Sequence, residues 1–399
     1  MSGPNQLPLA GVRVLDLSRI LAGPWATQLL ADYGAEVFKI ERPEVGDDTR
    51  GWGPPYVATG DAAYFYSANR NKKSVAIDIA TESGAALVRE LARSCDVFVE
   101  NFKLGGLAQY GLDYTSLSAL NPKIVYCSIT GFGQTGPNSN RPGYDYLIQA
   151  MAGLMSVTGQ ADGQPGSEPL KVGVAVSDLF TGLYAANAIQ AALRQVELTG
   201  QGCHLDAALY DCQIAALANQ AMNFITTDRS PQRLGNAHPS IVPYQVFEVA
   251  DGHIVIAVGN DSQFQDFCAG IERPDLGAIE KWRTNRGRVE DRAALITELV
   301  PILLKRSGEE WIDILEANGV PCGPIQSIGE AINSPQTVAR EQVIDHSNGL
   351  RTIGQPIPFP GQPTNAPPSL GAHTQAVLRN NLGLNGTEIA ALQEKGAVG

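Results

Sequence analysis

The stretch Val12-Arg-Val-Leu-Asp-Leu17, followed by Trp25–Tyr33 and then by Glu36-Val-Phe-Lys-Ile40, decides the fold of this chain. The two outer runs are short, apolar and rich in β-branched residues, as buried strands are, and the stretch between them has helical periodicity. Strand, helix and strand in this order form a parallel pair joined by a crossover helix. The chain therefore begins as a parallel α/β unit.

The same alternation continues along the first half of the chain. Further strands are expected at Ser74–Ile79, Asp96–Glu100 and Ile124–Ile129, a helix at Gly84–Ser94, and a long helix from Leu179 to about Gln195. Strands that alternate with helices predict a Rossmann-like parallel sheet with helices on both faces. Ligands of such sheets bind at the carboxyl ends of the strands.

From Asp228 onward, turn-rich sequence replaces this pattern. Strand signals at Tyr244–Val249 and a charged helical stretch at Arg286–Lys305 indicate a smaller α+β domain. The tail is rich in proline, and we expect it to run extended over a surface. The sequence thus divides into a large α/β domain at 1–227, a small domain at 228–331 and a C-terminal segment at 332–399 that returns to the large domain.

The composition argues against several classes of function. The net charge of −12 disfavours binding to nucleic acid. No run approaches the ~18 apolar residues of a membrane span, and no charged-then-apolar leader is present. Six scattered cysteines without a C-x-x-C pair and five distant histidines show no metal-ligand spacing. We expect a cytoplasmic protein without a catalytic metal.

Asp178 is the most informative single residue. It stands where the apolar run Lys171-Val-Gly-Val-Ala-Val176 gives way to the long helix. A carboxylate at the start of a helix can be an N-cap that accepts free backbone N–H groups. It can also be a nucleophile held at the edge of a packed core. The residue alone leaves both interpretations open.

Polar and basic side chains gather next to several predicted strands, where they can contact phosphates or simply face solvent. They are Arg42 after the second strand, Asn71, Lys72 and Lys73 before the third, and Asn101, Phe102 and Lys103 after the fourth. The turn Ser18–Pro24 after the first strand lacks G-x-G-x-x-G, which disfavours a nicotinamide dinucleotide. Phe102 offers an aromatic face on which a purine can lie.

Glycine-rich turns supply the remaining candidates. The loop Thr130–Pro137 precedes Arg141, and Tyr144 and Asp145 open the helix that follows. Asp145 is therefore also a possible helix cap. The pairs Gly235-Asn236 and Gly259-Asn260 either turn the chain or offer backbone N–H groups to an oxyanion. A serine hydrolase is disfavoured because G-x-S-x-G is absent.

In this order, the segments resemble the family III coenzyme A transferases, the group of formyl-CoA:oxalate and carnitine CoA-transferases. The resemblance covers nearly the whole chain and is specific because many weak motifs occur in one order. These motifs are Val14-Leu-Asp-Leu17, Ala22-Gly-Pro24, Lys39-Ile-Glu41, Gly46-Asp-Asp-Thr-Arg50, Asn71-Lys72, Val99-Glu-Asn-Phe102, Gly131–Pro137, Tyr144-Asp145, Ser177-Asp178, Gly235-Asn-Ala-His-Pro239 and Gly319-Val-Pro-Cys-Gly-Pro324.

The resemblance implies a CoA-transferase in which Asp178 is the covalent nucleophile and passes through an aspartyl-CoA thioester. Tyr144 and Asp145 would shape the site around the thioester, and the polar residues beside the strands, with Arg141, would contact CoA. The CoA thioester is then a substrate, and no cofactor is bound permanently. The resemblance also implies an interlocked homodimer.

The resemblance implies that the acceptor is a small carboxylic acid, and we expect a dicarboxylate. Leu21 stands where the oxalate-specific relatives carry glutamine, and the turn at Gly235 resembles relatives that use acetyl-CoA or succinyl-CoA. By this resemblance the acceptor would meet Leu21, Arg233, Gly235, Asn236, His238 and Gly259. An α-methylacyl-CoA racemase is the alternative. It is disfavoured because Tyr144 replaces the racemase histidine, and a phenol of pKa near ~10 is a poor base.

Overall fold

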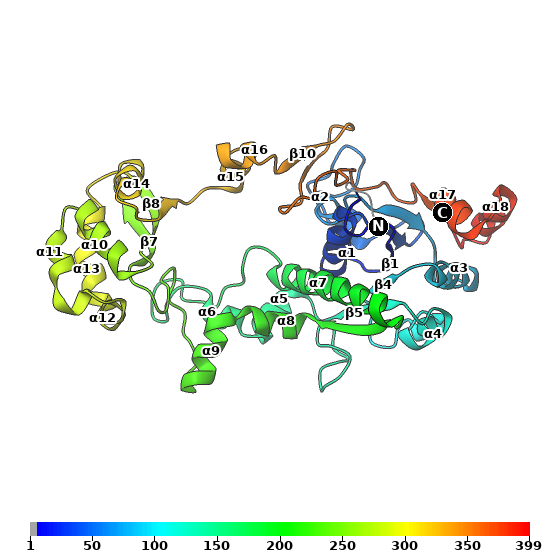
Figure 1. The fold of residues 1–399 in the computed structure, drawn as a ribbon, viewed down its shortest axis with the longest axis horizontal. Helices are drawn as coiled ribbons and strands as arrows, with labels where there is room; N and C mark the ends of the chain where they lie inside the picture. Colours follow the sequence, from blue (N-terminus) through cyan, green and yellow to red (C-terminus); the bar gives the residue numbers. More distant parts are fainter. Residues whose placement is uncertain (1–5) are drawn as a thin grey trace. The chain divides into compact units, whose positions relative to one another are not determined.

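The computed structural model describes residues 6–399, which divide into two compact units (Figure 1). The larger unit consists of the residues up to Leu154, Lys171–Asp228 and Gln336–Gly399. The smaller unit consists of Met155–Leu170 and Arg229–Pro335. The segment Met155–Leu170, which the sequence pattern assigned to the large domain, thus packs with the smaller unit.

The larger unit is built on a six-stranded sheet with the strand order β3-β2-β1-β4-β5-β6. All five pairs of neighbouring strands are parallel. This is the strand order of doubly wound dinucleotide-binding sheets, so the predicted Rossmann-like fold is confirmed. The strands are β1 (Arg13–Asp16), β2 (Glu36–Glu41), β3 (Lys73–Ala76), β4 (Val97–Glu100), β5 (Val125–Thr130) and β6 (Cys203–Ala208).

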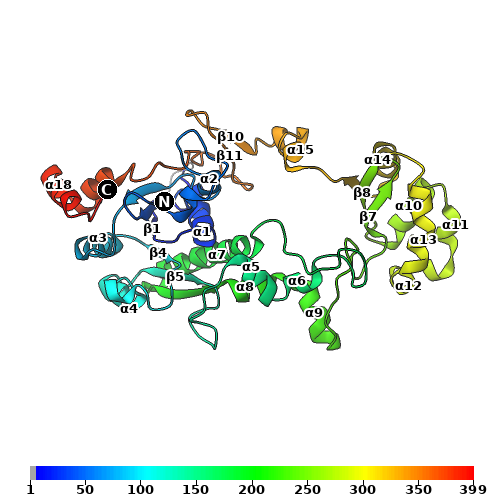
Figure 2. The same cartoon turned by 180° about the vertical axis from the view of Figure 1, so that it is seen from behind.

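Alternate strand residues point to opposite sides of this sheet. Apolar residues occur on both sides, so helices cover both faces. On one face, Val14 and Val97 pack with α1 (Ala22–Asp32), α5 (Asp145–Met151), α7 (Val176–Thr199) and α8 (Leu209–Ala216). On the other, Leu15 and Phe98 pack with four other helices (Figures 1 and 2). These are α3 (Glu82–Arg93), α4 (Tyr114–Leu120), α17 (Thr374–Leu382) and α18 (Gly386–Glu394).

The last two helices correct the expectation of an extended tail. The proline-rich part does run without regular structure, apart from the hairpin β10 (Val343–Asp345) and β11 (Arg351–Ile353). Beyond it, α17 and α18 bury Val377, Leu378 and Ile389 in the core of the larger unit. The tail therefore completes one face of the sheet. The proline pattern ended before these helices began, so it predicted only the first half of the tail.

Short elements complete the larger unit. They are the 3₁₀ helices η1 (Asp48–Gly51) and η2 (Ala108–Tyr110) and the helices α2 (Ala63–Tyr66), α9 (Ala218–Thr227) and α16 (Pro335–Ala339), the last beginning at the boundary of the smaller unit. Helix α7 ends at Gly200, whose φ of 71° is a left-handed conformation that glycine adopts without a Cβ clash.

The smaller unit has its own antiparallel sheet, β7-β8-β9, and its own core around Phe247, Ile254 and Trp311. The predicted helix at Arg286–Lys305 is two helices, α12 and α13. The strands are β7 (Tyr244–Val249), β8 (Gly252–Ala257) and β9 (Cys322–Pro324). The helices are α10 (Asp261–Gly270), α11 (Pro274–Ala278), η3 (Glu280–Trp282), α12 (Asn285–Glu290), α13 (Arg292–Leu303), α14 (Gly308–Ala317) and α15 (Ile328–Ile332), with α6 (Leu154–Val157) at the boundary.

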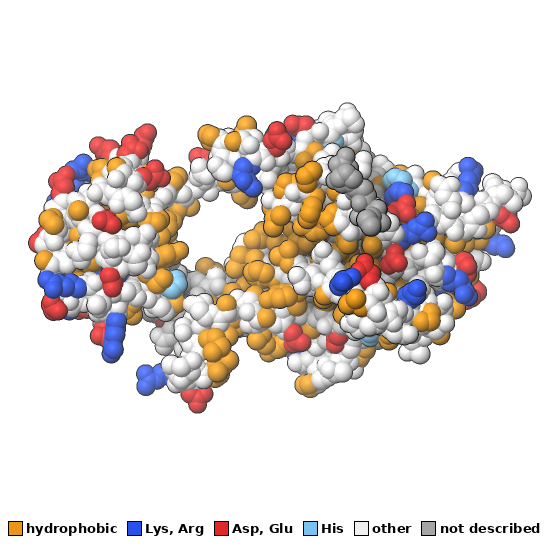
Figure 3. Space-filling view, viewed as in Figure 1, with side chains coloured by type: hydrophobic (Ala, Val, Ile, Leu, Met, Phe, Trp, Pro, Cys, Tyr) orange, Lys and Arg blue, Asp and Glu red, His pale blue; other side chains and the backbone are white. Residues whose placement is uncertain are grey.

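Helix α7 also has an exposed apolar face. Phe180, Leu183 and Tyr184 are 38%, 49% and 50% exposed, and apolar side chains gather over this part of the surface (Figure 3). Among residues 6–399, neither α7 nor any other helix combines the length and the apolar character that a bilayer crossing needs.

Candidate functional site

A cleft of about 700 Å³ opens at the carboxyl ends of the parallel strands in the larger unit. Its walls come from the carboxyl ends of β1 to β5 and the segments that follow them, and from the first turns of α5 and α7. Strands β1 and β4 are neighbours from which the chain winds in opposite directions, and ligands bind at such a switch point. The volume lies within the range of small-molecule sites.

Many of the residues singled out from the sequence meet in this cleft although they are far apart along the chain. They are Leu21, Arg42, Asn101, Phe102, Lys103, Arg141, Tyr144, Asp145 and Asp178.

Asp178 lies in the first turn of α7, but it is not the cap of that helix. The capping position belongs to Ala175, which provides no side-chain hydrogen bond. Instead Asp145 accepts the backbone N–H groups of Ser177 at 2.8 Å and of Asp178 at 3.3 Å. The carboxylate of Asp178 has no hydrogen bond or ion pair within the described residues 6–399. Asp178 lines the cleft, so its carboxylate is available to a ligand there.

This environment makes the charge of Asp178 costly. Burial, and then the nearby Asp145, raise the pKa of Asp178 from 3.8 to about 7. Asp145 is better supported, because Gln149 donates to its second oxygen at 2.6 Å. Two neighbouring carboxylates in different surroundings are a common arrangement in catalytic sites.

Tyr64, which the sequence reasoning did not single out, does not line the cleft but is close enough to feel the charges of its carboxylates. Burial, and then the charges of Asp178, Asp145 and Asp47, raise the pKa of Tyr64 to about 12. The phenol therefore keeps its proton and is close enough to Asp178 to sense its charge. Its only sequence signal was the aromatic run Tyr64-Phe-Tyr66, which carries no motif.

Cations line the outer part of the cleft. Arg42 and Lys103 are exposed and, in the part of the chain that the structure describes, form no ion pair. Arg19, which the sequence reasoning also missed, lies 2.9 Å from Asp48 and over the ring of Phe102 at 5.6 Å. Arg19 follows β1 directly, so the rule that selected Arg42 after β2 would have selected it too.

Asn101 has a structural partner. Its side-chain oxygen accepts the backbone N–H of Arg19 at 2.9 Å, and its side-chain nitrogen donates to the carbonyl of Arg19 at 2.7 Å. The amide therefore ties the loop after β4 to the loop after β1. Arg141 lies over the ring of Phe132 at 5.4 Å.

Three predicted CoA contacts lie elsewhere. Lys72 is buried, and its ammonium donates to Asp16 at 3.1 Å and to Asn69 at 2.9 Å. Lys73 pairs with Glu36, and Asn71 donates to Asp32. All three come at or before the start of β3, so they belong to the amino end of that strand, whereas the cleft opens at the carboxyl end.

The predicted acceptor residues, other than Leu21, belong to the smaller unit. Arg233 pairs with Asp162 and donates to the carbonyl of Ser167 at 3.1 Å, so its charge already has a partner. His238 packs against the ring of Tyr244 and accepts the N–H of Ser240 at 3.1 Å.

The glycine turns of the same unit are ordinary in geometry. Gly235 has a φ of 61° and is left-handed, Asn236 is exposed, and the N–H of Gly259 is already bonded to Gln263 at 2.8 Å. Among residues 6–399 no group of His, Cys, Asp and Glu side chains is arranged to hold a metal ion.

Comparison with known proteins accords with this geometry. The family model described as CoA-transferase family III matches residues 9–374. The succinate–glutarate CoA-transferase of Agrobacterium fabrum is 48% identical over 94% of this chain and 96% of its own length. The succinyl-CoA:glutarate CoA-transferase of Mus musculus is 45% identical over 94% of this chain and 86% of its own.

A solved structure is similar over almost the same span. The crystal structure of a CAIB/BAIF family protein from Brucella suis superposes with a TM-score of 0.84 at 46% identity. The match covers 94% of this chain and 100% of that one.

Proposed function

The chain belongs to CoA-transferase family III, and we propose that it moves CoA from succinyl-CoA or a similar acyl-CoA to a small dicarboxylic acid such as glutarate. The observation that carries the proposal is the carboxylate of Asp178, which has no hydrogen-bond partner among residues 6–399 and lies in a cleft whose lining includes the exposed cations Arg42 and Lys103. The names of the similar transferases supply the substrate class.

In the proposed reaction, a carboxylate oxygen of Asp178 attacks the thioester carbon, and the C–S bond breaks. The products are a mixed anhydride and the CoA thiolate. The thiolate then attacks the aspartyl carbonyl of the anhydride, the C–O bond breaks, and the donor acid leaves. Asp178 is now an aspartyl-CoA thioester. The acceptor carboxylate repeats the two steps in reverse, which frees Asp178 and yields the new acyl-CoA.

The surroundings of Asp178 suit these steps. A carboxylate without hydrogen bonds is a stronger nucleophile, because less solvation must be removed before it attacks. Asp145 accepts the N–H groups that would otherwise stabilise the charge of Asp178. Tyr64 retains its proton at neutral pH, because burial and the charges of Asp178, Asp145 and Asp47 raise the pKa of its phenol to about 12.

Residues of the outer cleft bind CoA in this scheme. Arg42 and Lys103 line the cleft, are exposed and form no ion pair among residues 6–399, so they are suited to the phosphates of CoA. Phe102 offers its ring to the adenine, and Arg141 borders the loop that precedes α5. CoA enters as a substrate in this scheme, and no permanently bound cofactor takes part.

The proposal includes a homodimer and a cytoplasmic location. The exposed apolar face of α7, formed by Phe180, Leu183 and Tyr184, supports an interface with a second copy (Figure 3). Six free cysteines accord with a reducing compartment.

The test is a transfer assay read by mass spectrometry. Wild-type protein with succinyl-CoA and glutarate is expected to form glutaryl-CoA and succinate, and the Asp178→Asn variant is expected to form neither. Without acceptor, the peptide that contains Asp178 should gain CoA with loss of water. If wild type forms no new thioester with any small diacid, the proposal is wrong.

A further inference from the structure

A buried ion pair between Lys39 and Asp47 lies directly beside the cleft, and the proposed chemistry leaves it unused. Both side chains are 0% exposed, and Lys39 Nζ lies 2.8 Å from Asp47 Oδ2. Both residues line the cleft. Desolvation of the two charges cancels much of their attraction, so a buried pair is weak evidence for a role in stability alone.

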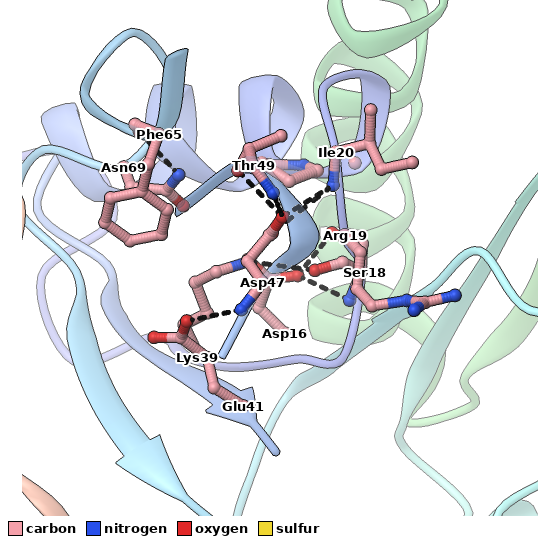
Figure 4. Close-up of polar contacts among 12 residues, drawn as sticks. Asp16, Ser18, Arg19, Ile20, Lys39, Glu41, Asp47, Thr49, Phe65 and Asn69 are labelled. Atoms are coloured by element: carbon pink, nitrogen blue, oxygen red, sulfur yellow. Dashed lines mark hydrogen bonds and ion pairs between the residues drawn. The ribbon is translucent and has the colours of Figure 1, made fainter. Parts of the chain in front are cut away.

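The pair holds the loop that follows β1 (Figure 4). Lys39 Nζ donates to the carbonyl of Ser18 at 3.0 Å. Both carboxylate oxygens of Asp47 lie 3.3 Å from the backbone nitrogen of Ile20, whose N–H they accept. Asp47 is itself fixed, because it accepts the N–H of Thr49 at 3.0 Å and its own N–H donates to Glu41 at 3.0 Å.

The held residue is strained. Ile20 has a φ of 74°, which is the left-handed conformation. A β-branched residue seldom adopts it, because its Cβ substituents crowd the backbone. Such a conformation persists only where the surroundings impose it, and strain of this kind gathers at functional sites. Here the imposing group is the carboxylate of Asp47.

The strained loop forms the wall of the cleft next to Asp178. Leu21 and Ala22 follow Ile20 and line the cleft, and their N–H groups have no acceptor among residues 6–399. The start of α1 packs on α7: a Cβ placed on Gly182, one turn beyond Asp178, would come within 2.7 Å of the carbonyl of Ala22. A shift of the loop would therefore move this wall relative to Asp178.

We propose that Lys39 and Asp47 are positioning residues for CoA transfer, which hold Ile20 in its left-handed conformation and so fix Leu21 and Ala22 beside the reacting carboxylate. The inference rests on the proposed role of Asp178. Neither residue is required to contact substrate, since both act through the loop. A misplacement of 1 Å at a reacting centre can cost about 10²-fold in rate.

The first variant for the test is Asp47→Asn, which keeps the size of the side chain and one acceptor oxygen but removes the charge that faces Lys39. We expect kcat to fall by about 10- to 100-fold. The KM for succinyl-CoA should stay within about threefold, because Arg42 and Lys103 are unchanged.

The second variant separates positioning from general support of the fold. Glycine adopts a φ of 74° without crowding, so Ile20→Gly removes the need for the pair. The double variant Ile20→Gly/Asp47→Asn should have a kcat within about threefold of Ile20→Gly alone. A double variant that remains at least about tenfold slower, or that does not fold, overturns the inference, since the pair then acts beyond Ile20.

A matched control comes from another buried ion pair in the same unit. Arg70 Nε lies 2.9 Å from Asp32 Oδ1, and neither residue lines the cleft. Asp32→Asn should lower the urea midpoint and leave kcat unchanged. An equal loss of kcat in Asp32→Asn and Asp47→Asn would mean that both act through stability, and the inference would fail.

The CoA adduct on Asp178 of the wild-type protein is measured first. Its absence refutes the proposed function itself. Its presence, together with an undiminished kcat in Asp47→Asn, refutes only the positioning role.

Discussion

Replacement of Asp178 by asparagine should abolish transfer and at the same time make the protein more stable at alkaline pH. Asparagine has nearly the same shape but no charge. The carboxylate has a pKa of 3.8 in an unfolded chain and about 7 in the folded one, because burial and Asp145 disfavour its charge. The folded state therefore holds the proton more tightly, and its stability falls as pH rises from about 4 to about 7.

The size of the effect follows from the shift. Each pKa unit corresponds to about 1.4 kcal/mol, so the full cost above pH 7 is at most about 4 kcal/mol. Asp178 is partly exposed, and solvent screening reduces this to roughly 2 kcal/mol. More than half of the change falls between pH 5 and pH 8. The stability advantage of Asp178→Asn over wild type should therefore grow by roughly 1 kcal/mol across that interval.

The assay is urea unfolding of both proteins at pH 5 and pH 8, followed by tryptophan fluorescence. The quantity compared is the difference in unfolding free energy between variant and wild type at pH 8, minus the same difference at pH 5. This subtraction removes any effect of the substitution that does not depend on pH. Asp275→Asn serves as a control, because Arg273 lowers the pKa of that exposed carboxyl further below 3.8 and its difference from wild type should be flat above pH 5. If the advantage of Asp178→Asn shrinks as pH rises, the carboxylate is stabilised as a helix cap and the reasoning is refuted.

Three further outcomes follow. Burial raises the pKa of Glu100 from 4.5 to about 6, so Glu100→Gln should gain up to about 2 kcal/mol of stability at pH 8 and lose this gain by pH 4.5 in urea unfolding. Arg42→Ala and Lys103→Ala should each raise the KM for succinyl-CoA about tenfold without changing the KM for glutarate. The control Arg13→Ala, at the amino edge of the sheet, should change neither KM. Equal effects of all three variants on the KM for succinyl-CoA would contradict the proposed phosphate contacts. If the protein is the proposed dimer, Leu183→Glu should convert it to monomers in light scattering, and a dimer mass that the substitution leaves unchanged would place α7 outside the interface.

The sequence predicts the fold well because the strands of a parallel sheet have a recognisable sequence pattern. Val12–Leu17 and Glu36–Ile40 are apolar on both sides, since helices cover both faces, and the order of the elements then restricts the topology. The tail was harder to predict. Helix α17 becomes part of the core by packing on β3 and α3, and α18 adds Ile389 to the same core. No local sequence signal predicts such distant contacts.

The site is predictable to the extent that it follows from strand ends. Arg42, Asn101 and Lys103 follow β2 and β4, so their presence in the cleft follows from the topology alone. Lys72 shows the limit of this reasoning. A lysine beside a strand has the same sequence signal whether its ammonium faces a phosphate or, as here, a buried aspartate. Tyr64 and Ile20 were beyond the sequence, because one depends on tertiary proximity and the other on a backbone angle.

The cleft has two unusual features, the raised pKa of Asp178 and the strained backbone of Ile20. The role of nucleophile proposed for Asp178 needs a poorly solvated position, which this carboxylate obtains at a cost to stability. A rigid wall beside it needs a strained loop, which Ile20 provides and the Lys39–Asp47 pair maintains. Burial raises the pKa of Asp47, but Lys39 and Thr49 outweigh it and lower the pKa to about 2. Asp47 therefore stays ionised across the whole range in which Asp178 gains and loses its proton. The Lys39–Asp47 pair therefore adds no ionisation of its own near neutral pH, and the pH dependence of transfer should show the ionisation of Asp178, the proposed nucleophile, near pH 7.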